Sequence, residues 1–305
     1  MCGNYRNWKL SELTMEDVEN SRNQDQDNSE LRRPHYLEPE SLNEIPLWMA
    51  PCHLVAAIFQ IMQSLFLFAF SSQINMRWLV YTNYPTRDSA LLGVNEYAKP
   101  QPKEIGAFNI TWLAAAFVIM SGIDHILCIM PLTRSSYEWY LRRNQSPFRW
   151  YEYGMSAALM RVLISMIAGV TDVTLLVAIF FLTNCMINFG IIHERLNGRA
   201  LADGHKLDWT PFWMSWVAQI AAWTIIFFYY AEKIKGASSP VYIGFILIVL
   251  FVLDGGFALT QALQWLKIGV FKDYMVGEFV FVVLSFTAKT FLAWVITAGG
   301  ANNRH

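Results

Sequence analysis

The stretch VLSFTAKTFLAWVI (residues 282–295) places one lysine, Lys289, in the middle of an apolar run. Residues 279–288 and 290–298 carry no charged side chain. A lysine at the centre of a membrane helix costs about 2.5–3.5 kcal/mol on the insertion scale. The centre of the hydrocarbon layer lies about 15 Å from its edge, which is farther than a lysine side chain reaches. Lys289 therefore needs a partner, a neutral state or a covalent modification.

The composition is that of a multi-pass membrane protein. Of the 305 residues, 54% are hydrophobic and 15% are charged, whereas soluble domains carry about 25% charge. The net charge of −1 gives no general attraction to nucleic acid, so we expect no nucleic-acid partner. The four cysteines form no C-x-x-C pair, which predicts neither a metal site nor a disulfide framework.

Seven apolar segments follow the polar N-terminus, and each is near the ~20 residues that a helix needs to cross a membrane. We therefore predict an all-α membrane protein, a seven-transmembrane-helix bundle within residues 46–300. The third segment is the least apolar, because it includes Arg149 and Glu152. The segments are centred in residues 48–71, 108–130, 147–169, 172–192, 210–231, 240–264 and 277–298.

The polar parts of the chain lie at its two ends and in one long connection. Residues 1–45 have the composition of a disordered tail and lack a signal-peptide pattern. The connection 72–107 is long enough to have a structure of its own, and we expect a cap over one mouth of the bundle, with a β-ribbon as one form of it. Residues 301–305 form a short second tail.

Lysine and arginine in the connections predict the orientation. The connections after the second, fourth and sixth segments, together with Arg149 at the start of the third, carry nine Lys and Arg, whereas those after the third and fifth carry only Lys233 and Lys235. Cytoplasmic loops are enriched in these residues. We expect a cytoplasmic N-terminus and tail, an extracellular loop between the first two helices, and an extracellular C-terminal tail.

Several motifs together resemble the heliorhodopsin family over residues 48–300. They are RWYEYGMSAALM (149–160), SFTAK (285–289), DHIL (124–127) and HERLN (193–197). The resemblance implies all-trans retinal on Lys289 as a protonated Schiff base, Glu152 as its counterion, a sensory role and a homodimer. One departure is QIMQ (60–63), where Gln60 stands at the position of a family histidine; we expect only His125 to carry over, and Gln60 to line the pocket.

The chemistry of the residues favours the same arrangement. A lysine amine can condense with an aldehyde, and the buried cation so formed needs an anion; Glu152 is the acid of the third segment. A polyene belongs in an apolar cavity between helices. Ser285 lies one turn before Lys289 on the same helix face, where its hydroxyl can accept a hydrogen bond from the lysine nitrogen or simply help the helices pack.

The remaining polar and aromatic candidates each have two interpretations. His125 is a proton acceptor near Glu152 or a structural histidine. Asp254 is a functional acid or bonds to backbone freed by Gly255 and Gly256. Glu194 either shares a proton path with Asp254 or forms a solvated ion pair with its neighbours at the cytoplasmic edge. Three aromatic residues are candidates for the pocket or for ordinary core and lipid contacts: Trp216, Phe251 and Phe257.

Three functions remain open from the sequence. The favoured one is a non-enzymatic photoreceptor in the plasma membrane, which signals by photoisomerisation and conformational change to an unidentified cytoplasmic partner. The second is a light-driven or light-gated proton transporter. The third is a chromophore-free transporter in which Lys289 pairs with an acid such as Glu152 or Asp254.

Overall fold

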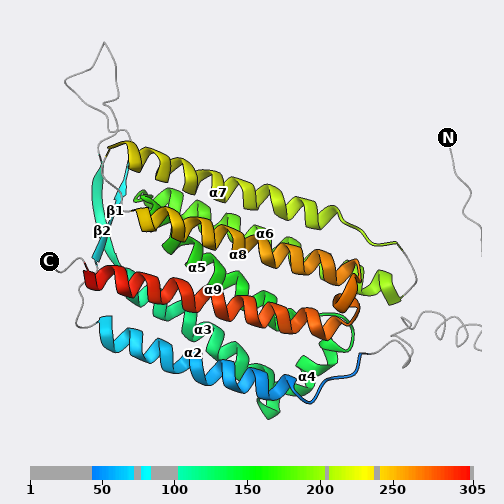
Figure 1. Ribbon diagram of the computed structural model, residues 1–305. Coiled ribbons are helices and arrows are strands. Elements are labelled where there is room, and N and C mark those ends of the chain that lie inside the picture. The colour runs from blue at the N-terminus through cyan, green and yellow to red at the C-terminus, as the bar shows by residue number, and fades with distance from the viewer. Residues whose placement is uncertain (1–42, 72–76, 84–101, 203–205, 237–240, 303–305) are drawn as a thin grey trace, which may run out of the picture. The chain divides into compact units, whose positions relative to one another are not determined.

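Eight α-helices and a two-stranded sheet make up the part of the chain that the computed structural model describes, residues 43–71, 77–83, 102–202, 206–236 and 241–302 (Figure 1). The expected tail at residues 1–45 lies almost entirely outside these residues. The elements are α2 (Met49–Ser71), β1 (Arg77–Thr82), β2 (Lys103–Asn109), α3 (Ile110–Ile129), α4 (Pro131–Leu141), α5 (Pro147–Ala168), α6 (Val173–Ala202), α7 (Thr210–Gly236), α8 (Val241–Trp265), the short 3₁₀ turn η3 (Gly269–Lys272) and α9 (Tyr274–Asn302).

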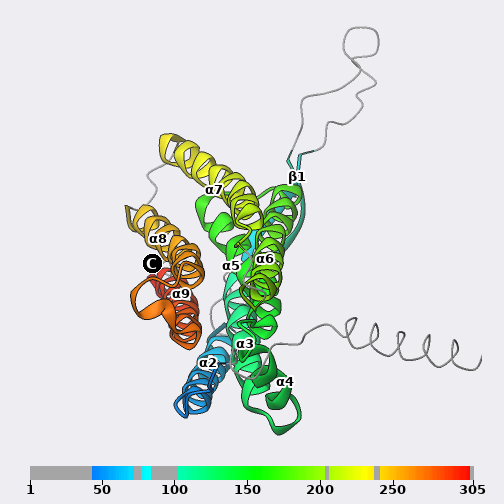
Figure 2. The same ribbon diagram turned by 90° about the vertical axis from the view of Figure 1, so that its right-hand side faces the viewer.

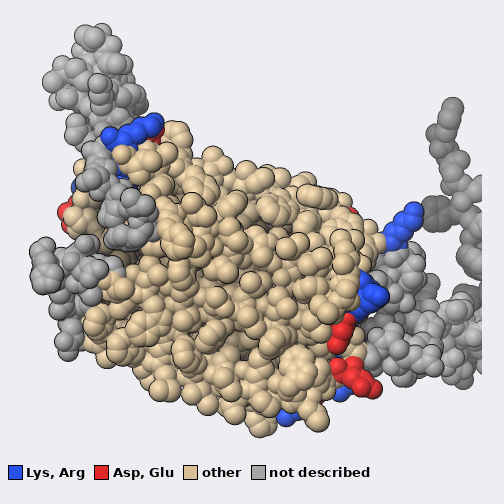
Figure 3. Space-filling view, in the orientation of Figure 1, with Lys and Arg blue, Asp and Glu red and all other residues tan. Residues whose placement is uncertain are grey.

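Six of the helices are long and apolar enough to cross a membrane: α2, α3, α6, α7, α8 and α9. Their mean hydropathies lie between 1.4 and 2.3. Charged side chains on the visible face gather at the two ends of the helices, and the surface between these ends is free of them (Figure 3). An apolar band bounded by charged rims is the surface that a bilayer requires, because the hydrocarbon layer cannot solvate charge. The chain is therefore an integral membrane protein.

Helix α5 is not among these six, and its place in the bundle explains its polarity. It packs between α3 and α6 and also contacts α7 and α8 (Figures 1 and 2). Thirteen of its 22 residues are buried, among them Arg149, Glu152 and Arg161. These polar side chains face other helices rather than the membrane, so a segment of low hydropathy can occupy the centre of the bundle.

The turn between α5 and α6 is set by two local features. Gly169 ends α5 with a φ of 113°, a left-handed conformation that glycine adopts without a steric penalty. Asp172 then precedes α6, and its Oδ1 accepts hydrogen bonds from the backbone N–H groups of Thr174 (2.8 Å) and Leu175 (3.2 Å). This is an N-terminal cap, which satisfies donors that the first helical turn leaves free. The short turn makes α5 and α6 antiparallel neighbours.

The two strands lie at the ends of the long connection between α2 and α3. They pair antiparallel, with Arg77 opposite Asn109 and an irregularity between Val80 and Tyr81. The N–H of Tyr81 donates to the carbonyl of Thr171 at 2.9 Å, which attaches the ribbon to the α5–α6 turn. Most of the connection between the strands, residues 84–101, lies outside the described residues.

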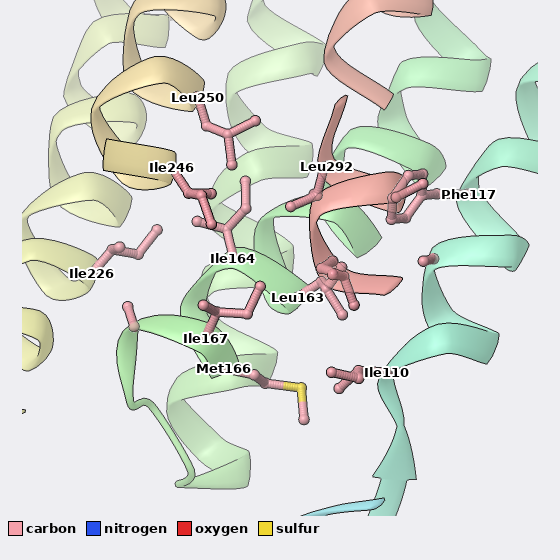
Figure 4. Packing of buried hydrophobic residues seen from close by; sticks show 14 of the residues in the cluster. Ile110, Phe117, Leu163, Ile164, Met166, Ile167, Ile226, Ile246, Leu250 and Leu292 are labelled. Atoms are coloured by element: carbon pink, nitrogen blue, oxygen red, sulfur yellow. The ribbon is translucent and has the colours of Figure 1, made fainter. Parts of the chain in front are cut away.

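The apolar core occupies the half of the bundle nearest this ribbon. Leu163, Ile164 and Ile167 of α5 pack there against Phe117 of α3 and Leu292 of α9 (Figure 4). Close packing, rather than exclusion from water, stabilises such contacts between membrane helices. The other half of α5, from Arg149 to Arg161, carries the charged and polar side chains from which the site is built.

Candidate functional site

Lys289 and Glu152 form a buried ion pair between α9 and α5. The Nζ of Lys289 lies 2.6 Å from Oε1 of Glu152, and the two side chains are only 4% and 5% exposed. The same Nζ lies 3.0 Å from Oγ of Ser121 on α3. The structure thus brings together the two residues that the sequence paired, and it adds a third polar group from a helix that the sequence analysis had not linked to the lysine.

Ser285 lies beside this pair, but the recorded partners of the lysine nitrogen are Glu152 and Ser121. Ser285 is buried and lines the cavities on both sides of the pair. Ser121 could have been found from the sequence, because it precedes His125 by four residues and so shares its face of α3. The hydrogen bond assigned to Ser285 is therefore made by Ser121 in this structure.

A cavity extends from Lys289 between α5, α6, α7, α8 and α9. Its walls are mostly apolar and aromatic, as is usual for small-molecule sites. Trp216 and Phe257, both predicted pocket residues, line it. The remaining lining residues are Trp150, Tyr153, Ala157, Met160, Met186, Ile187, Gly190, Ser215, Gln219, Asp254, Ala258, Gln261, Phe281, Ser285 and Ala288.

One wall of the cavity depends on a glycine. A Cβ atom at Gly190 would lie 2.4 Å from the indole ring of Trp150, so this ring lies directly against the backbone of α6. The close approach places Trp150 between α5 and α6 at the cavity surface.

Two other predicted pocket residues lie elsewhere. Phe251 is 43% exposed and packs against Trp223 and Phe227, at the outer side of α7 and α8. Gln60 is fully buried in α2 but is not among the residues that line the cavity. Their positions depend on the rotation of each helix about its axis. Apolar periodicity does not determine this rotation when a helix is apolar on all sides.

A second, polar chamber lies on the other side of Glu152. His53 and His125 face each other across it, with their Nδ1 atoms 2.9 Å apart, and Nε2 of His53 lies 2.8 Å from the hydroxyl of Tyr137. The chamber is lined by His53, Ser121, Asp124, His125, Cys128, Tyr137, Ser146, Arg149, Glu152, Tyr153, Glu278, Val282 and Ser285.

The expectation that only His125 would carry over was therefore wrong. Gln60 follows His53 by seven residues, which is two helical turns, so both residues lie on one face of α2. The tertiary structure instead places His53 against His125.

Arg149, which lines the chamber, forms ion pairs with two glutamates. Its Nη2 lies 2.6 Å from Oε2 of Glu194 on α6, and its Nη1 donates to Glu278 on α9. Glu194 also accepts hydrogen bonds from Nε1 of Trp150 at 2.7 Å and from the backbone N–H of Ser146. The predicted solvated pair of Glu194 with its chain neighbours is wrong, because α6 continues to residue 202 and carries Glu194 inside the bundle rather than at its edge.

Asp254 is part of a separate polar group at the opposite side of the cavity. Its Oδ2 accepts hydrogen bonds from Nη2 of Arg161 at 2.5 Å, from Nε1 of Trp223 at 2.7 Å and from Nε2 of Gln219. The carboxylate is therefore held by side chains of α5 and α7 rather than by backbone freed at the adjacent glycines. Arg161 had not been singled out, although a cation inside a membrane helix is itself an indication of a buried acid partner.

The family model for heliorhodopsins matches residues 50–300 of the chain. No curated protein sequence matches this chain.

Among solved structures, the bundle resembles a light-driven proton pump, LR (Mac), from Leptosphaeria maculans, with a TM-score of 0.59 and 11% identity over 85% of this chain and 98% of that one. It also resembles Exiguobacterium sibiricum rhodopsin, with a TM-score of 0.55 and 12% identity over 83% of this chain and 96% of that one. At these identities the likeness concerns the fold alone.

Proposed function

The chain belongs to the heliorhodopsin family, and from this premise we propose that it is a photoreceptor that holds all-trans retinal on Lys289. Family membership implies a retinal chromophore and a light-responsive protein. The observation that carries the proposal is the position of the Lys289 nitrogen, which meets Glu152 at 2.6 Å and lines a long apolar cavity.

The residues fit this chromophore. The cavity offers aromatic and methionine side chains to an apolar chain and a single primary amine to an aldehyde. Bound there, retinal supplies the absorption of visible light and a change of shape on illumination. The apolar walls exclude water from the lysine nitrogen, and Glu152 supplies the negative charge that a buried cation requires.

Glu152 and Ser121 would also orient the N–H bond of Lys289. Both accept from the same nitrogen, one from α5 and the other from α3. A change in the direction or charge of this N–H weakens the contacts that join α9 to these two helices. We propose that this loss of contacts starts the conformational change that carries the signal.

We further propose seven spans, with α5 as the seventh, and a cytoplasmic N-terminus. The Lys and Arg that follow the second, fourth and sixth predicted segments support this orientation, which puts the β1–β2 ribbon on the extracellular side. Single cysteines at two exposed positions test it: Lys272→Cys in η3 and Lys235→Cys at the end of α7. In intact cells an impermeant maleimide is expected to label the second above the wild-type background and not the first; the reverse pattern would refute the orientation.

The proposed cellular role is sensory. We place the protein in the plasma membrane as a homodimer that acts on a cytoplasmic partner, and we propose no enzymatic activity. Cross-linking in native membranes, followed by size analysis, tests the dimer.

A light-driven or light-gated proton transporter is the second candidate. The observation that favours it is the presence of buried carboxyl groups on both sides of Glu152 along α5: Glu194 and Glu278 around Arg149, and Asp254 at Arg161. Arg161 follows Glu152 by nine residues, or about 13 Å of helix. A light-dependent current under voltage clamp that disappears in Glu152→Gln would favour transport, and the absence of any current would favour sensing.

Reconstitution with all-trans retinal is the decisive experiment for the proposed function. The purified protein is expected to develop a visible absorption band, and Lys289→Ala is expected to develop none. If no band forms, or if Lys289→Ala forms the same band, the proposal fails and a chromophore-free transporter becomes the better account.

A further inference from the structure

The buried charges of the bundle do not balance. Inside the described part of the bundle, three buried cations meet five carboxyl groups: Asp124, Glu152, Glu194, Asp254 and Glu278. Lys289 pairs with Glu152, Arg161 pairs with Asp254, and Arg149 is shared by two glutamates. Asp124 of α3 is in no ion pair among the described residues, and its recorded hydrogen bond is a long one, 4.0 Å from Sγ of Cys128.

Asp124 also occupies a special position between two hollows. It lines the polar chamber beside Glu152, and it lines a groove on the outer side of α3 and α5. Glu152 is the other residue that lines both. The groove is walled mainly by apolar side chains such as Ile123, Leu127 and Met155. Asp124 and Glu152 therefore form the partition between the chamber and the groove.

The surroundings of Asp124 favour a neutral carboxyl group. An ionised carboxylate that faces apolar side chains without a cation loses much of its solvation free energy, and a neighbouring anion adds repulsion. Three cations face these hollows, and none pairs with Asp124 among the described residues: Lys289 and Arg149 are engaged by acids, and Arg195 donates to the hydroxyl of Tyr151 at 3.1 Å. The remaining titratable neighbours are His53, His125, Cys128, Tyr137, Tyr153 and Glu278 in the chamber, with Tyr140 and Tyr151 in the groove.

We propose that Asp124 carries a proton in the resting protein and is the internal proton donor that restores the charge of Lys289. The protonation of Asp124 at rest is independent of the proposed function, whereas its role as proton donor rests on that function. When the lysine N–H bond has broken and its proton has passed to His125 in the chamber, Glu152 is still a carboxylate; the O–H bond of Asp124 then breaks as an O–H bond forms on Glu152, and that proton forms the new N–H bond of Lys289. Asp124 is left as a carboxylate and takes a replacement proton from water at the groove.

The resting protonation is tested without retinal. In infrared spectra of the apoprotein, wild type is expected to show the carbonyl stretch of a protonated carboxylic acid, and Asp124→Asn is expected to lose it. Asp254→Asn is the matched control, because it also removes a span carboxyl, but one that is paired with Arg161. If the band is the same in wild type and Asp124→Asn, the proposal is overturned.

The pigment gives a second and independent measurement. Asparagine has nearly the shape of a protonated aspartic acid and the same charge, so Asp124→Asn is expected to leave the absorption maximum in place. An ionised Asp124 would instead act as a second counterion, and its replacement would shift the maximum to longer wavelength, as for Glu152→Gln. Such a shift would overturn the proposal; failure to form pigment at all would count against the proposed function and leave the infrared result standing.

The donor role is tested by the recovery of the resting spectrum after a flash. Asp124→Asn is expected to slow it by about 100-fold, at the lower end of what a positioned proton donor contributes, and Asp124→Glu is expected to restore most of the rate. Unchanged recovery in Asp124→Asn would refute this role.

The groove as the proton route is tested by exchange in heavy water. Ile123→Trp narrows the groove and is expected to slow the isotope shift of the Asp124 band. Ile126→Trp is the control, since Ile126 is also exposed on α3 but does not line the groove. Equal exchange in the two variants would exclude this route.

Discussion

The Nζ of Lys289 on α9 lies 2.6 Å from Oε1 of Glu152 on α5, although 137 residues separate them in the chain. Both side chains are buried, so each charge depends on the other for its solvation. Removing one partner of such a pair leaves an uncompensated buried charge and destabilises proteins by about 3–5 kcal/mol. This relationship joins two helices at the point where the cavity and the chamber meet.

Glu152→Gln is expected to shift the absorption maximum of the retinal-loaded protein to longer wavelength. The carboxylate stabilises the positive charge at Lys289 in the ground state more than in the excited state, in which the charge moves away from the nitrogen. Visible spectra at fixed pH measure the shift. Glu138→Gln is the control, because Glu138 pairs with Arg134 on α4 outside the site; an equal maximum in Glu152→Gln and wild type would remove Glu152 as counterion.

Ser121→Ala is expected to change the absorption maximum more than Ser285→Ala does. Ser121 Oγ lies 3.0 Å from the lysine nitrogen, whereas Ser285 is not among the recorded partners of that nitrogen. A neutral hydrogen bond contributes about 1 kcal/mol, so both shifts should be smaller than that of Glu152→Gln. A larger effect of Ser285→Ala would instead support Ser285 as the hydroxyl that accepts a hydrogen bond from the lysine nitrogen.

Arg149→Gln is expected to destabilise the apoprotein by about 3–5 kcal/mol, because it leaves Glu194 and Glu278 without a cation inside the bundle. Thermal unfolding in detergent measures the loss. Arg134→Gln removes an exposed ion pair and should change stability by less than about 1 kcal/mol. Similar unfolding temperatures for the two variants would show that the buried cluster contributes no more than a surface pair.

Gly190→Ala is expected to impair retinal uptake. Its Cβ would lie 2.4 Å from the ring of Trp150, which must then move into the cavity or away from α6. Gly255→Ala provides the control, since a Cβ at Gly255, on a helix that lines the cavity, meets nothing within 4 Å. The rate and extent of pigment formation are compared at equal protein concentration, and equal uptake in the two variants would show that the wall at Trp150 is not limiting.

Asp172→Ala is expected to lower stability by about 1 kcal/mol through loss of the α6 cap, whereas Asp172→Asn should retain most of it. Burial raises the pKa of Asp172, but hydrogen bonds from Thr174, Leu175 and Asn83 together lower it by more than burial raises it. The net pKa therefore lies below the ordinary value of 3.8.

The pH dependence of this cap follows from that direction. A lowered folded-state pKa contributes stability that is present above the ordinary value and is lost as the pH falls through the folded-state value. The difference in unfolding temperature between wild type and Asp172→Ala should therefore narrow as the pH drops below about 3.8. A difference that stays constant into this acid range would contradict the assignment of Asp172 as an ionised cap.

Local chain chemistry predicted much of the fold. The apolar segments marked the helices to within a few residues, except that α6 continues to residue 202 and residues 131–141 form a separate short helix, α4. Both differences involve polar residues, where the need to cross a membrane gives no guidance and helix formation depends on neighbours and caps. The third segment was predicted as part of the bundle from its length and apolar content although its charges make it the least apolar, and the structure explains these charges by its central position.

The sequence by itself determined that Lys289 lies in the middle of an apolar segment and needs a partner, a neutral state or a covalent modification, because the energetic penalty of a lone charge depends on its depth in the segment. The tertiary structure decided which groups share its surroundings: Ser121 rather than Ser285, His53 beside His125, two glutamates on Arg149, and Asp124 in no ion pair within the described part of the chain. The physical reason is that these helices are apolar on nearly all sides. Periodicity then leaves the rotation of each helix undetermined, and packing against its neighbours sets which side chains face one another.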